Sequence, residues 1–540
     1  MNSLLFSLIL NMEIAVACLL SGKLLIHYFQ LESYQFPGYF RTVRRNLLKS
    51  LLPGLCMMIL LIVTIKVSGI LLPEKESNFF RALIVMLIMI CGGMIFGKVF
   101  SEKKAKKKFV FTARVKRLYT VSAVVMMILL MIAAGNASSE SHGGRFFTAF
   151  ILVFPILLPI WVALCGLIAW PVEKAISEMY FRDAQSILQK RRDLIRIGIT
   201  GSWGKTSVKF ILGTILGEKF NTYITPASYN TPMGVTKAIR SGLEPGHRVF
   251  IAEMGARHVG DIKEMCRLVH PQMGIITSVG PQHLDTFHTI ERIIKTKYEL
   301  IEALPADGEA FFADDNGICR KLYEQTKIKK HLSGMDPRVN EVWAEDIQYN
   351  PEGSSFMLCK GSDKITCRTQ LLGELNIQNI LLCASVAFSL GLNLSQIARG
   401  ISRIKPVDHR LQLIRHPGGL NVIDDSFNSN IQGARQAFQV LKQFPGKRIV
   451  ITPGMVELGE QEYEMNRQFG TFMADCCDLA ILVGKKRSEA IAGGLREKGY
   501  PDSAVLTVAS LEDATDLLKK SAGAGDTVLF ENDLPDNYTE

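Results

Sequence analysis

"IGITGSWGKTSVKF" (residues 197–210) is the stretch that decides the fold of the second part of the chain. A β-like run ends at Thr200, and apolar residues recur at helical spacing after Lys205. Glycines between a strand and a helix let backbone N–H groups face an anion, and the helix N-terminus adds a positive dipole. The string fits the short TGxxGK[ST] pattern, whereas Ile199 stands where the longer GxxxxGK[ST] pattern needs its first glycine. We therefore predict a phosphate loop made of Gly201, Ser202, Gly204, Lys205 and Thr206.

Two further polar residues follow the next predicted strands. "AEMGARH" (252–258) places Glu253 at the carboxyl end of one strand, and "TSVGPQHLDTF" (277–287) places His283 just after another. Open α/β sheets bind ligands at this edge. In a phosphate loop, Lys205 neutralises the β- and γ-phosphates and the Thr206 hydroxyl holds Mg²⁺. The sequence therefore predicts a metal-centred site beside the loop.

Strand-like and helical patterns alternate from residue 195 to the end of the chain. Such alternation predicts α/β domains with parallel sheets. Between about 329 and 372 the pattern changes to short β-type runs, and a boundary near 405–410 separates two α/β units. We predict one domain over 195–405 and a second over 406–540.

The first 170 residues carry five apolar stretches near or above the length that spans a bilayer. They cover about 4–27, 50–73, 80–99, 118–135 and 146–170. We predict a five-span transmembrane region over 1–170 and an amphipathic connecting helix over 171–194. Glu13 lies in the first span, where a carboxylate is either functional or kept neutral near the interface.

Loop charges predict the orientation of these spans. Lys and Arg are concentrated in the connectors 30–49 and 101–117 ("SEKKAKKKFVFTARVKR"), whereas 73–78 and 135–144 contain few. Because basic loops stay on the cytoplasmic side, we expect the N-terminus outside and everything after about 171 in the cytoplasm. The expected location is a plasma membrane of bacterial type, with the α/β domains on its cytoplasmic side.

The net charge of +11 comes from 62 Lys and Arg against 51 Asp and Glu. A basic excess fits either nucleic acid or the anionic face of a membrane. Much of the excess lies in the short connectors between apolar stretches, so we expect a membrane partner and no nucleic acid. The eleven cysteines include no CxxC pair, which predicts reduced thiols rather than a disulfide framework or a zinc ribbon.

Seven blocks, in order over residues 196–540, together resemble the Mur ligase family of ATP-dependent ligases in cell-wall precursor synthesis. They are "TGSWGKTS", "EMGARHVGDI", "TSVGPQHLDTF", "KTKYELIEALP", "ELNIQN", "VIDDSFNSN" and "GMVELGE". The branch that adds D-alanyl-D-alanine is the most similar. The resemblance implies a substrate-binding N-terminal domain, a central ATPase and a Rossmann-like C-terminal domain. Only the last two are visible in this sequence, and the predicted spans occupy the place of the first.

The resemblance also implies roles for single residues. Thr206 and Glu253 correspond to ligands of a first Mg²⁺, and His283 to a ligand of a second. Lys297 in "KTKYEL" matches the lysine that the family carbamylates, which replaces a repelled ammonium with an anionic oxygen ligand. By spacing alone, Lys295 competes for this role. Lys205, Glu253, His283 and Lys297 form the implied catalytic set.

Four more residues match nucleotide contacts of the family. Asn376 and Asn379 correspond to the adenine pair, Arg410 to an arginine that reaches the phosphates, and Asp425 to an acid at ribose or phosphate. Three positions depart from the pattern: Thr231 replaces an asparagine after Asn230, Leu375 a histidine, and Ile431 a proline. With the missing sugar-binding domain, these departures leave the acyl substrate open.

The implied reaction is amide formation through an acyl phosphate at the expense of ATP, with two Mg²⁺ ions. The amine is expected to be an amino acid or a dipeptide such as D-Ala-D-Ala, and the carboxylate a peptidoglycan-type precursor, soluble or lipid-linked. A poly-γ-glutamate-type polymer synthase is an alternative ligase. From other classes, a membrane transporter coupled to its own ATPase and a non-catalytic nucleotide sensor stay open, as does the oligomeric state.

Overall fold

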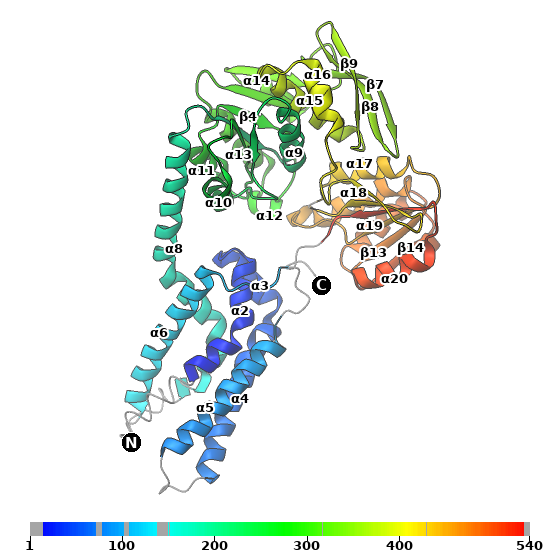
Figure 1. Cartoon of the computed structure of the whole chain (residues 1–540). Coiled ribbons are helices and arrows are strands. Elements are labelled where there is room, and N and C mark those ends of the chain that lie inside the picture. The colour runs from blue at the N-terminus through cyan, green and yellow to red at the C-terminus, as the bar shows by residue number, and fades with distance from the viewer. Residues whose placement is uncertain are drawn as a thin grey trace. The chain divides into compact units, whose positions relative to one another are not determined.

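The fold is taken from a computed structural model, which describes residues 14–71, 78–101, 107–137, 149–150, 152–315, 317–427 and 429–533. The chain forms two compact units that divide between Glu178 and Met179 (Figure 1). Glu13 lies outside the described residues.

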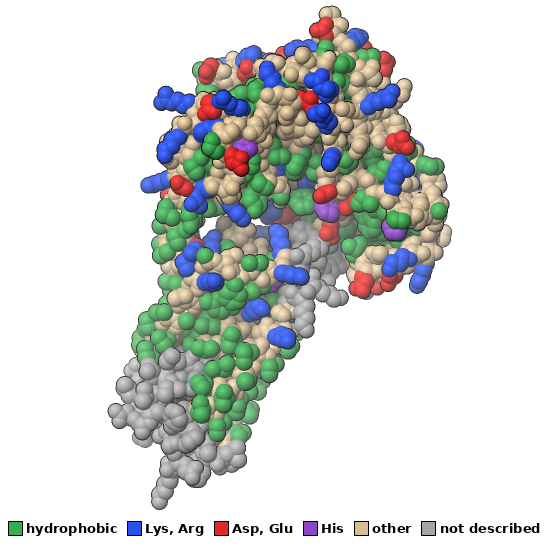
Figure 2. Space-filling model, viewed as in Figure 1, with side chains coloured by type: hydrophobic (Ala, Val, Ile, Leu, Met, Phe, Trp, Pro, Cys, Tyr) green, Lys and Arg blue, Asp and Glu red, His purple; other side chains and the backbone are tan. Residues whose placement is uncertain are grey.

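The first unit is helical. After a helix over Ile14–Ser21 come α2 (Lys23–Leu31), α3 (Phe36–Arg45), α4 (Leu47–Leu71), α5 (Asn78–Val99), α6 (Ala113–Ala137), η1 (Phe154–Leu157) and α8 (Leu158–Gln189). The described part of each predicted span overlaps one or more of these helical segments. Hydrophobic side chains gather on their visible face in Figure 2, and Leu48, Ile59, Ile95 and Ile160 are each more than half exposed.

Length and composition allow fewer crossings than the five predicted. Among the described residues, the helices Leu47–Val67 and Phe154–Gln189 are long and apolar enough to cross a membrane. A third crossing is formed if Ile14–Ser21 and Lys23–Leu31, bent by 46°, act as one broken span. Leu83–Val99 is apolar but shorter. A multi-pass region of five spans therefore stays a prediction.

Helix α8 runs without a break through the point where the sequence predicted a separate connecting helix over 171–194. Pro171 lies inside it, and the helix ends at Gln189. The change at 171 is one of hydropathy and not of backbone conformation, because charged residues enter a helix that has already begun at Leu158.

The second unit begins with a parallel α/β domain. Its sheet has the order β2-β3-β1-β4-β5-β6 and comprises β1 (Ile195–Thr200), β2 (Thr222–Ile224), β3 (Val249–Glu253), β4 (Met273–Ile276), β5 (Glu309–Ala313) and β6 (Lys329–Ser333). Helix α9 (Lys205–Leu216) packs on one face with α15 (Glu374–Ser389) and α16 (Leu394–Ser402). The other face is covered by α10 (Pro232–Gly242), α11 (Asp261–Val269), α13 (Ile290–Glu302) and α14 (Ile318–Gln325).

The β-type runs after residue 329 form a small antiparallel sheet of β7 (Trp343–Asn350), β8 (Gly353–Lys360) and β9 (Asp363–Thr369). Alternate side chains of this sheet, such as Phe356 and Leu358, are buried in the same core as α9 and α15. The sheet therefore belongs to the first α/β domain, as the sequence boundary near 405 implied.

The last domain is a second α/β sheet with the order β10-β11-β15-β12-β13-β14. Its strands are β10 (Gln412–Arg415), β11 (Asn421–Asp425), β12 (Arg448–Thr452), β13 (Leu479–Val483), β14 (Val505–Val508) and β15 (Thr527–Glu531), and its helices are α17 (Ile431–Leu441), α18 (Glu462–Ala474), α19 (Ser488–Glu497) and α20 (Leu511–Ser521). Only β10 is antiparallel to its neighbour. The prediction of two α/β domains is confirmed.

Candidate nucleotide site

The predicted phosphate loop connects β1 to α9. Gly201 and Gly204 have φ of 154° and 81°, conformations that favour glycine. A Cβ atom on Gly201 would lie 2.1 Å from the Thr277 hydroxyl, so a side chain does not fit there. The loop thus brings bare backbone to the N-terminus of α9, the arrangement that suits an oxyanion.

The Lys205 amine folds back over this loop. Its Nζ donates hydrogen bonds to the carbonyls of Gly201 (2.7 Å) and Ser202 (3.0 Å). Burial lowers the pKa of Lys205 to about 8, with Arg410 adding to the shift and Glu253 opposing it. A bound phosphate would offer the amine the anionic partner that it lacks here.

Residues that follow β4 are hydrogen-bonded to the loop and hold it in place. The Ser278 hydroxyl accepts from the backbone N–H of Trp203 at 2.8 Å, and Thr277 Oγ1 donates to the Trp203 carbonyl at 2.5 Å. Ser202 Oγ donates to the Gly280 carbonyl at 2.9 Å. No role was predicted for this "TSVG" stretch, because it lies more than seventy residues from the loop that it contacts.

Glu253, at the end of β3, collects three polar partners. Its Oε1 accepts from Thr206 Oγ1 (3.0 Å) and Asn230 Nδ2 (3.1 Å), and its Oε2 lies 3.0 Å from Lys209 Nζ. Glu253 and Lys209 are both buried, with side-chain exposures of 1% and 0%. The structure thus brings the predicted residues Thr206 and Glu253 together. It also adds Lys209, which was not predicted; the feature of the sequence that could have revealed it is a charged residue on the apolar face of α9, one turn after Lys205.

His283 contacts the last domain. Its Nδ1 is hydrogen-bonded to Glu457 Oε2, and Arg257 Nη2 lies 3.3 Å from Glu457 Oε1. Burial alone would raise the pKa of Glu457, but the bond to His283 and the charge of Arg257 outweigh it and lower the pKa. Glu457 is part of the quoted block "GMVELGE", although no role was predicted for it.

Lys297 lies on α13 with only 3% of its surface exposed, whereas Lys295 is exposed. Burial lowers the pKa of Lys297 well below the ordinary value, and the charge of Lys205 adds to this effect. Among the described residues, no hydrogen bond or ion pair to its amine is found. Of the two competing lysines, Lys297 therefore has the environment of a neutral amine.

The predicted nucleotide contacts lie at different distances from the loop. A Cβ atom on Gly204 would be 3.1 Å from Asn379 Oδ1, so Asn379 adjoins the loop. Asn376, one turn earlier on α15, donates to the Leu372 carbonyl at 2.9 Å. Thr231 stands where the family pattern has a second asparagine. Its hydroxyl accepts a hydrogen bond from the Gly234 N–H and caps α10.

Arg410 and Asp425 belong to the last domain. Arg410 Nη1 donates to the Phe427 carbonyl at 2.7 Å, and Asp425 Oδ1 accepts from the Leu411 N–H at 3.0 Å. Burial lowers the pKa of Arg410, while Asp425 and Glu253 oppose the shift. Its charge therefore acts on the same centre as Lys205 and Glu253.

These residues fit a triphosphate with a divalent cation. The glycine cradle and the buried Lys205 suit phosphate oxygens, and the buried Glu253 carboxylate beside the Thr206 hydroxyl suits a divalent cation. No group of three or more His, Cys, Asp or Glu side chains is placed to hold a metal within the described ranges. The predicted set of metal ligands, which includes the Thr206 hydroxyl and a modified Lys297, therefore stays a prediction.

Comparison with known proteins places this site in a family. The model of the Mur ligase middle domain matches residues 199–387, and that of the Mur ligase glutamate ligase domain matches residues 409–531. UDP-N-acetylmuramoyl-tripeptide–D-alanyl-D-alanine ligase of Escherichia coli (strain K12) is 30% identical over 337 residues, 61% of this chain and 74% of that protein. The enzyme of the same name from Bacillus subtilis (strain 168) is 26% identical over 338 residues, 62% of this chain and 72% of its own length.

Solved structures agree. MurF from Acinetobacter baumannii superposes with a TM-score of 0.60 at 25% identity and covers 66% of this chain and 77% of its own. MurF ligase from Thermotoga maritima, solved in complex with ADP, has the same fold with a TM-score of 0.59 at 24% identity, over 66% of this chain and 80% of its own. The matches lie in the α/β part that carries the phosphate loop, and the chain belongs to the Mur ligase family of ATP-dependent amide ligases.

Proposed function

We propose that the protein is a membrane-anchored ligase that joins D-alanyl-D-alanine, or a similar amine, to the carboxylate of a peptidoglycan-type precursor. The observation that carries the proposal is the joined set of Lys205, Thr206 and Glu253 at the end of the parallel sheet. Relatives at 26% and 30% identity that bear the name of a D-alanyl-D-alanine ligase support the choice of amine.

The chemistry proceeds in two displacements. A carboxylate oxygen of the precursor attacks the γ-phosphorus of ATP, ADP leaves, and an acyl phosphate is formed. The amine nitrogen then attacks the acyl carbon, the C–O bond to phosphate breaks, and the amine loses a proton as the amide forms. Lys205 holds the phosphates in line and offsets the repulsion between two anionic reactants.

Two Mg²⁺ ions are proposed to neutralise the phosphate charge when bound. Thr206 and Glu253 would hold the first, while His283 and a carbamylated Lys297 would serve the second. Carbamylation needs a neutral amine, and the buried Lys297 supplies one. Because Glu457 holds the His283 ring through Nδ1, the ring would present Nε2 to the metal.

Membrane anchoring rests on the first unit. Its helices expose large apolar side chains, and the basic connectors 30–49 and 101–117 flank them. We place these helices in the plasma membrane of a bacterial-type cell and the ligase domains in the cytoplasm. The acceptor would then be either a soluble nucleotide-linked precursor or its lipid-linked form.

The test uses the full chain, purified in detergent, with ATP, Mg²⁺, D-Ala-D-Ala and UDP-linked or lipid-linked muropeptide acceptors. Phosphate release and the mass of the new amide are read together. The proposal predicts one phosphate for each amide. Phosphate release that a solute stimulates without any amide product would reject the ligase and favour the transporter.

A further inference from the structure

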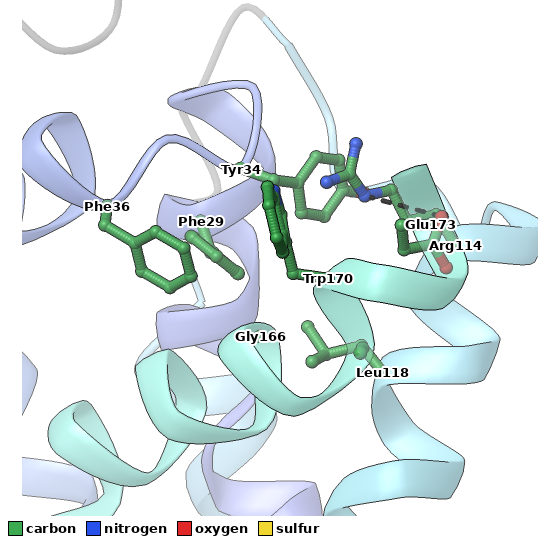
Figure 3. Close-up of a pocket in the computed structure, with 9 residues that line it drawn as sticks. Phe29, Tyr34, Phe36, Arg114, Leu118, Gly166, Trp170 and Glu173 are labelled. Atoms are coloured by element: carbon green, nitrogen blue, oxygen red, sulfur yellow. Dashed lines mark ion pairs between the residues drawn. The ribbon is translucent and has the colours of Figure 1, made fainter. Parts of the chain in front are cut away.

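A small pocket in the first unit combines aromatic, apolar and charged walls (Figure 3). Three segments that are distant in sequence line it: the turn from α2 to α3, the start of α6, and the middle of α8. The space between them is small and partly open to solvent. Leu118, Gly166 and Ala169 form its apolar side, and Arg114 and Glu173 its polar side.

The guanidinium of Arg114 is the unusual feature of this pocket. It lies on the face of the Tyr34 ring, with its Cζ 3.9 Å from the ring centroid. The Glu173 carboxylate is 3.7 Å from its Nε, too far for a hydrogen bond. Among the described residues, none accepts a hydrogen bond from this guanidinium. The five N–H donors of an arginine in this position are therefore available to an oxyanion.

Glu173 is an ion-pair partner of Arg114, but its hydrogen bonds come from a second arginine. Arg117 donates two hydrogen bonds to it, at 2.5 Å from Nε and 2.8 Å from Nη2. Tyr34 and the preceding Ser33 both have positive φ values, 63° and 53°, which are uncommon outside glycine. This strained turn holds the Tyr34 ring under Arg114 and so fixes the direction of the guanidinium.

The pocket is lined by segments predicted to lie at the cytoplasmic surface of the membrane. Its walls come from the edges of the two basic connectors, 30–49 and 101–117, and from the end of the last predicted span at 170. All three were predicted at the cytoplasmic boundary of the membrane. Trp170, which points into the pocket in Figure 3, is of the residue type enriched at that boundary. Lipid phosphates lie at the same level, and basic pockets between helices bind them.

We propose that this pocket binds the phosphate head of a membrane lipid, with Arg114 on the phosphate and the hydrocarbon next to it along Leu118 and Ala169. The inference rests on the membrane placement in the proposed function. It names the class of molecule that the anchor recognises: an amphiphile with a phosphate or diphosphate head next to its hydrocarbon part. Free phosphate would miss the apolar wall, and an alcohol of the same chain would leave Arg114 without its partner.

The test is calorimetric titration of the lipid-free full chain in detergent, without ATP or Mg²⁺. The probes are farnesyl monophosphate, farnesol, dihexanoyl phosphatidic acid and inorganic phosphate. Wild-type protein is expected to bind one or both lipid phosphates at least about tenfold more tightly than farnesol or inorganic phosphate. Whichever of these two lipid phosphates binds more tightly indicates whether the natural ligand is a prenyl phosphate or a glycerophospholipid.

Arg114→Gln is expected to weaken lipid phosphate binding about tenfold or more, since it removes a charge-assisted bidentate contact. Lys116→Gln is the matched control, because it removes the same charge from the exposed face of the same helix, and it should bind like the wild type. Ala169→Phe keeps Arg114 but fills the apolar side, so it should also weaken binding.

The inference is overturned if farnesol binds as well as farnesyl monophosphate to the wild type, a result that does not depend on any variant folding. Equal losses in Arg114→Gln and Lys116→Gln would overturn it too, because they would indicate general surface charge. Amide formation is assayed separately. A chain that makes the amide but binds no lipid phosphate would reject the pocket alone, and a chain that binds the lipid without making the amide would reject only the ligase.

Discussion

At the scale of single residues, Lys205 is the side chain on which the ATP chemistry depends. Within the described part of the chain, its amine bonds backbone carbonyls of its own loop, so its removal takes away the charge that would hold the phosphates. We expect Lys205→Ala to lower kcat for phosphate release by roughly 10²–10³-fold while the fold is kept. The measurement is acceptor-dependent ADP formation, with circular dichroism as the check on folding. A variant that retains half of the activity would show that the loop does not hold ATP.

Lys297 gives a second prediction, about its modification. Its burial favours a neutral amine, which can add CO₂, whereas the Lys295 side chain is exposed. With ¹³C-bicarbonate, we expect a carbamate signal by NMR in the wild type and in Lys295→Ala. Lys297→Ala should lack both the signal and most of the ligase activity. A carbamate signal that persists in Lys297→Ala would assign the modification to another lysine.

The sequence predicted some members of this site and missed others for a physical reason. Lys205 and Thr206 follow from a local pattern, because a strand, a glycine loop and a helix fix their positions within a few residues, and Glu253 follows from its place at the end of another predicted strand. Lys209 and Glu457 depend on long-range packing: Lys209 faces the end of a different strand, and Glu457 meets His283 across 174 residues. No spacing rule contains such distances, so the ligand set around His283 could not be derived from the sequence.

At the scale of elements, the ends of β11 and β15 bring two acids together. Asp425 pairs with Glu531 in the strand register, and Glu531 is fully buried with its Oε2 lacking a hydrogen bond. Burial raises the pKa of Glu531 well above its ordinary value, and Asp425 adds to the shift. Burial also raises the pKa of Asp425 to about 6, against the opposing charge of Arg410.

This acid pair predicts a pH dependence of stability. The folded chain holds protons above pH 4 that the unfolded chain has released, so the free energy of unfolding falls as pH rises from about 4 through 6 and beyond. Glu531→Gln removes this cost and should raise Tm by about 2–4 °C at pH 8, with the gain shrinking toward pH 4. Scanning calorimetry of the full chain checks it, with the exposed Glu512→Gln as control. A gain that is the same at every pH would indicate altered packing instead.

Helix packing in the first unit gives a further prediction. Gly93 and Gly97, four residues apart on α5, lie against the helix Ile14–Ser21: added Cβ atoms would be 2.6 Å from the Ala17 carbonyl oxygen and 2.3 Å from that of Leu20. Because backbone cannot give way, Gly97→Val should separate the helices and cost about 1–3 kcal/mol.

The matched control for this packing is Gly92→Ala, whose Cβ would meet only the end of the Leu60 side chain, which can rotate away. Thermal stability of the full chain in detergent, followed by size exclusion, should fall for Gly97→Val and stay near the wild type for Gly92→Ala. Equal stability of Gly97→Val and the wild type would mean that α5 does not pack in this way.

At the scale of the whole molecule, the sequence predicted which segments form domains and helices better than where each helix ends. The seven ordered blocks identified both α/β domains, because five of them lie at the carboxyl ends of strands and the other two lie in α13 and α15. Hydropathy located the helices of the first unit, but it ended the last one at 170, whereas α8 continues to Gln189. Hydropathy reports which side chains tolerate lipid, and it does not register the backbone hydrogen bonds that carry a helix past Pro171.

The division into two compact units makes the role of the first one testable. We expect the full chain to sediment with membranes, to resist washing with alkaline carbonate and to dissolve only in detergent, because its helices expose large apolar side chains. A chain that starts at Met179 keeps both α/β domains and should be found in the soluble fraction.

Protease treatment then tests the orientation. With the basic connectors on the cytoplasmic side, the α/β domains should be digested in inside-out vesicles and protected in right-side-out ones. The Met179 chain serves as the control for intrinsic protease sensitivity. Release of the full chain by carbonate would show that the first unit attaches to the membrane only peripherally. Digestion in right-side-out vesicles would place the ligase domains outside the cell, where ATP is not available, and would contradict the predicted orientation.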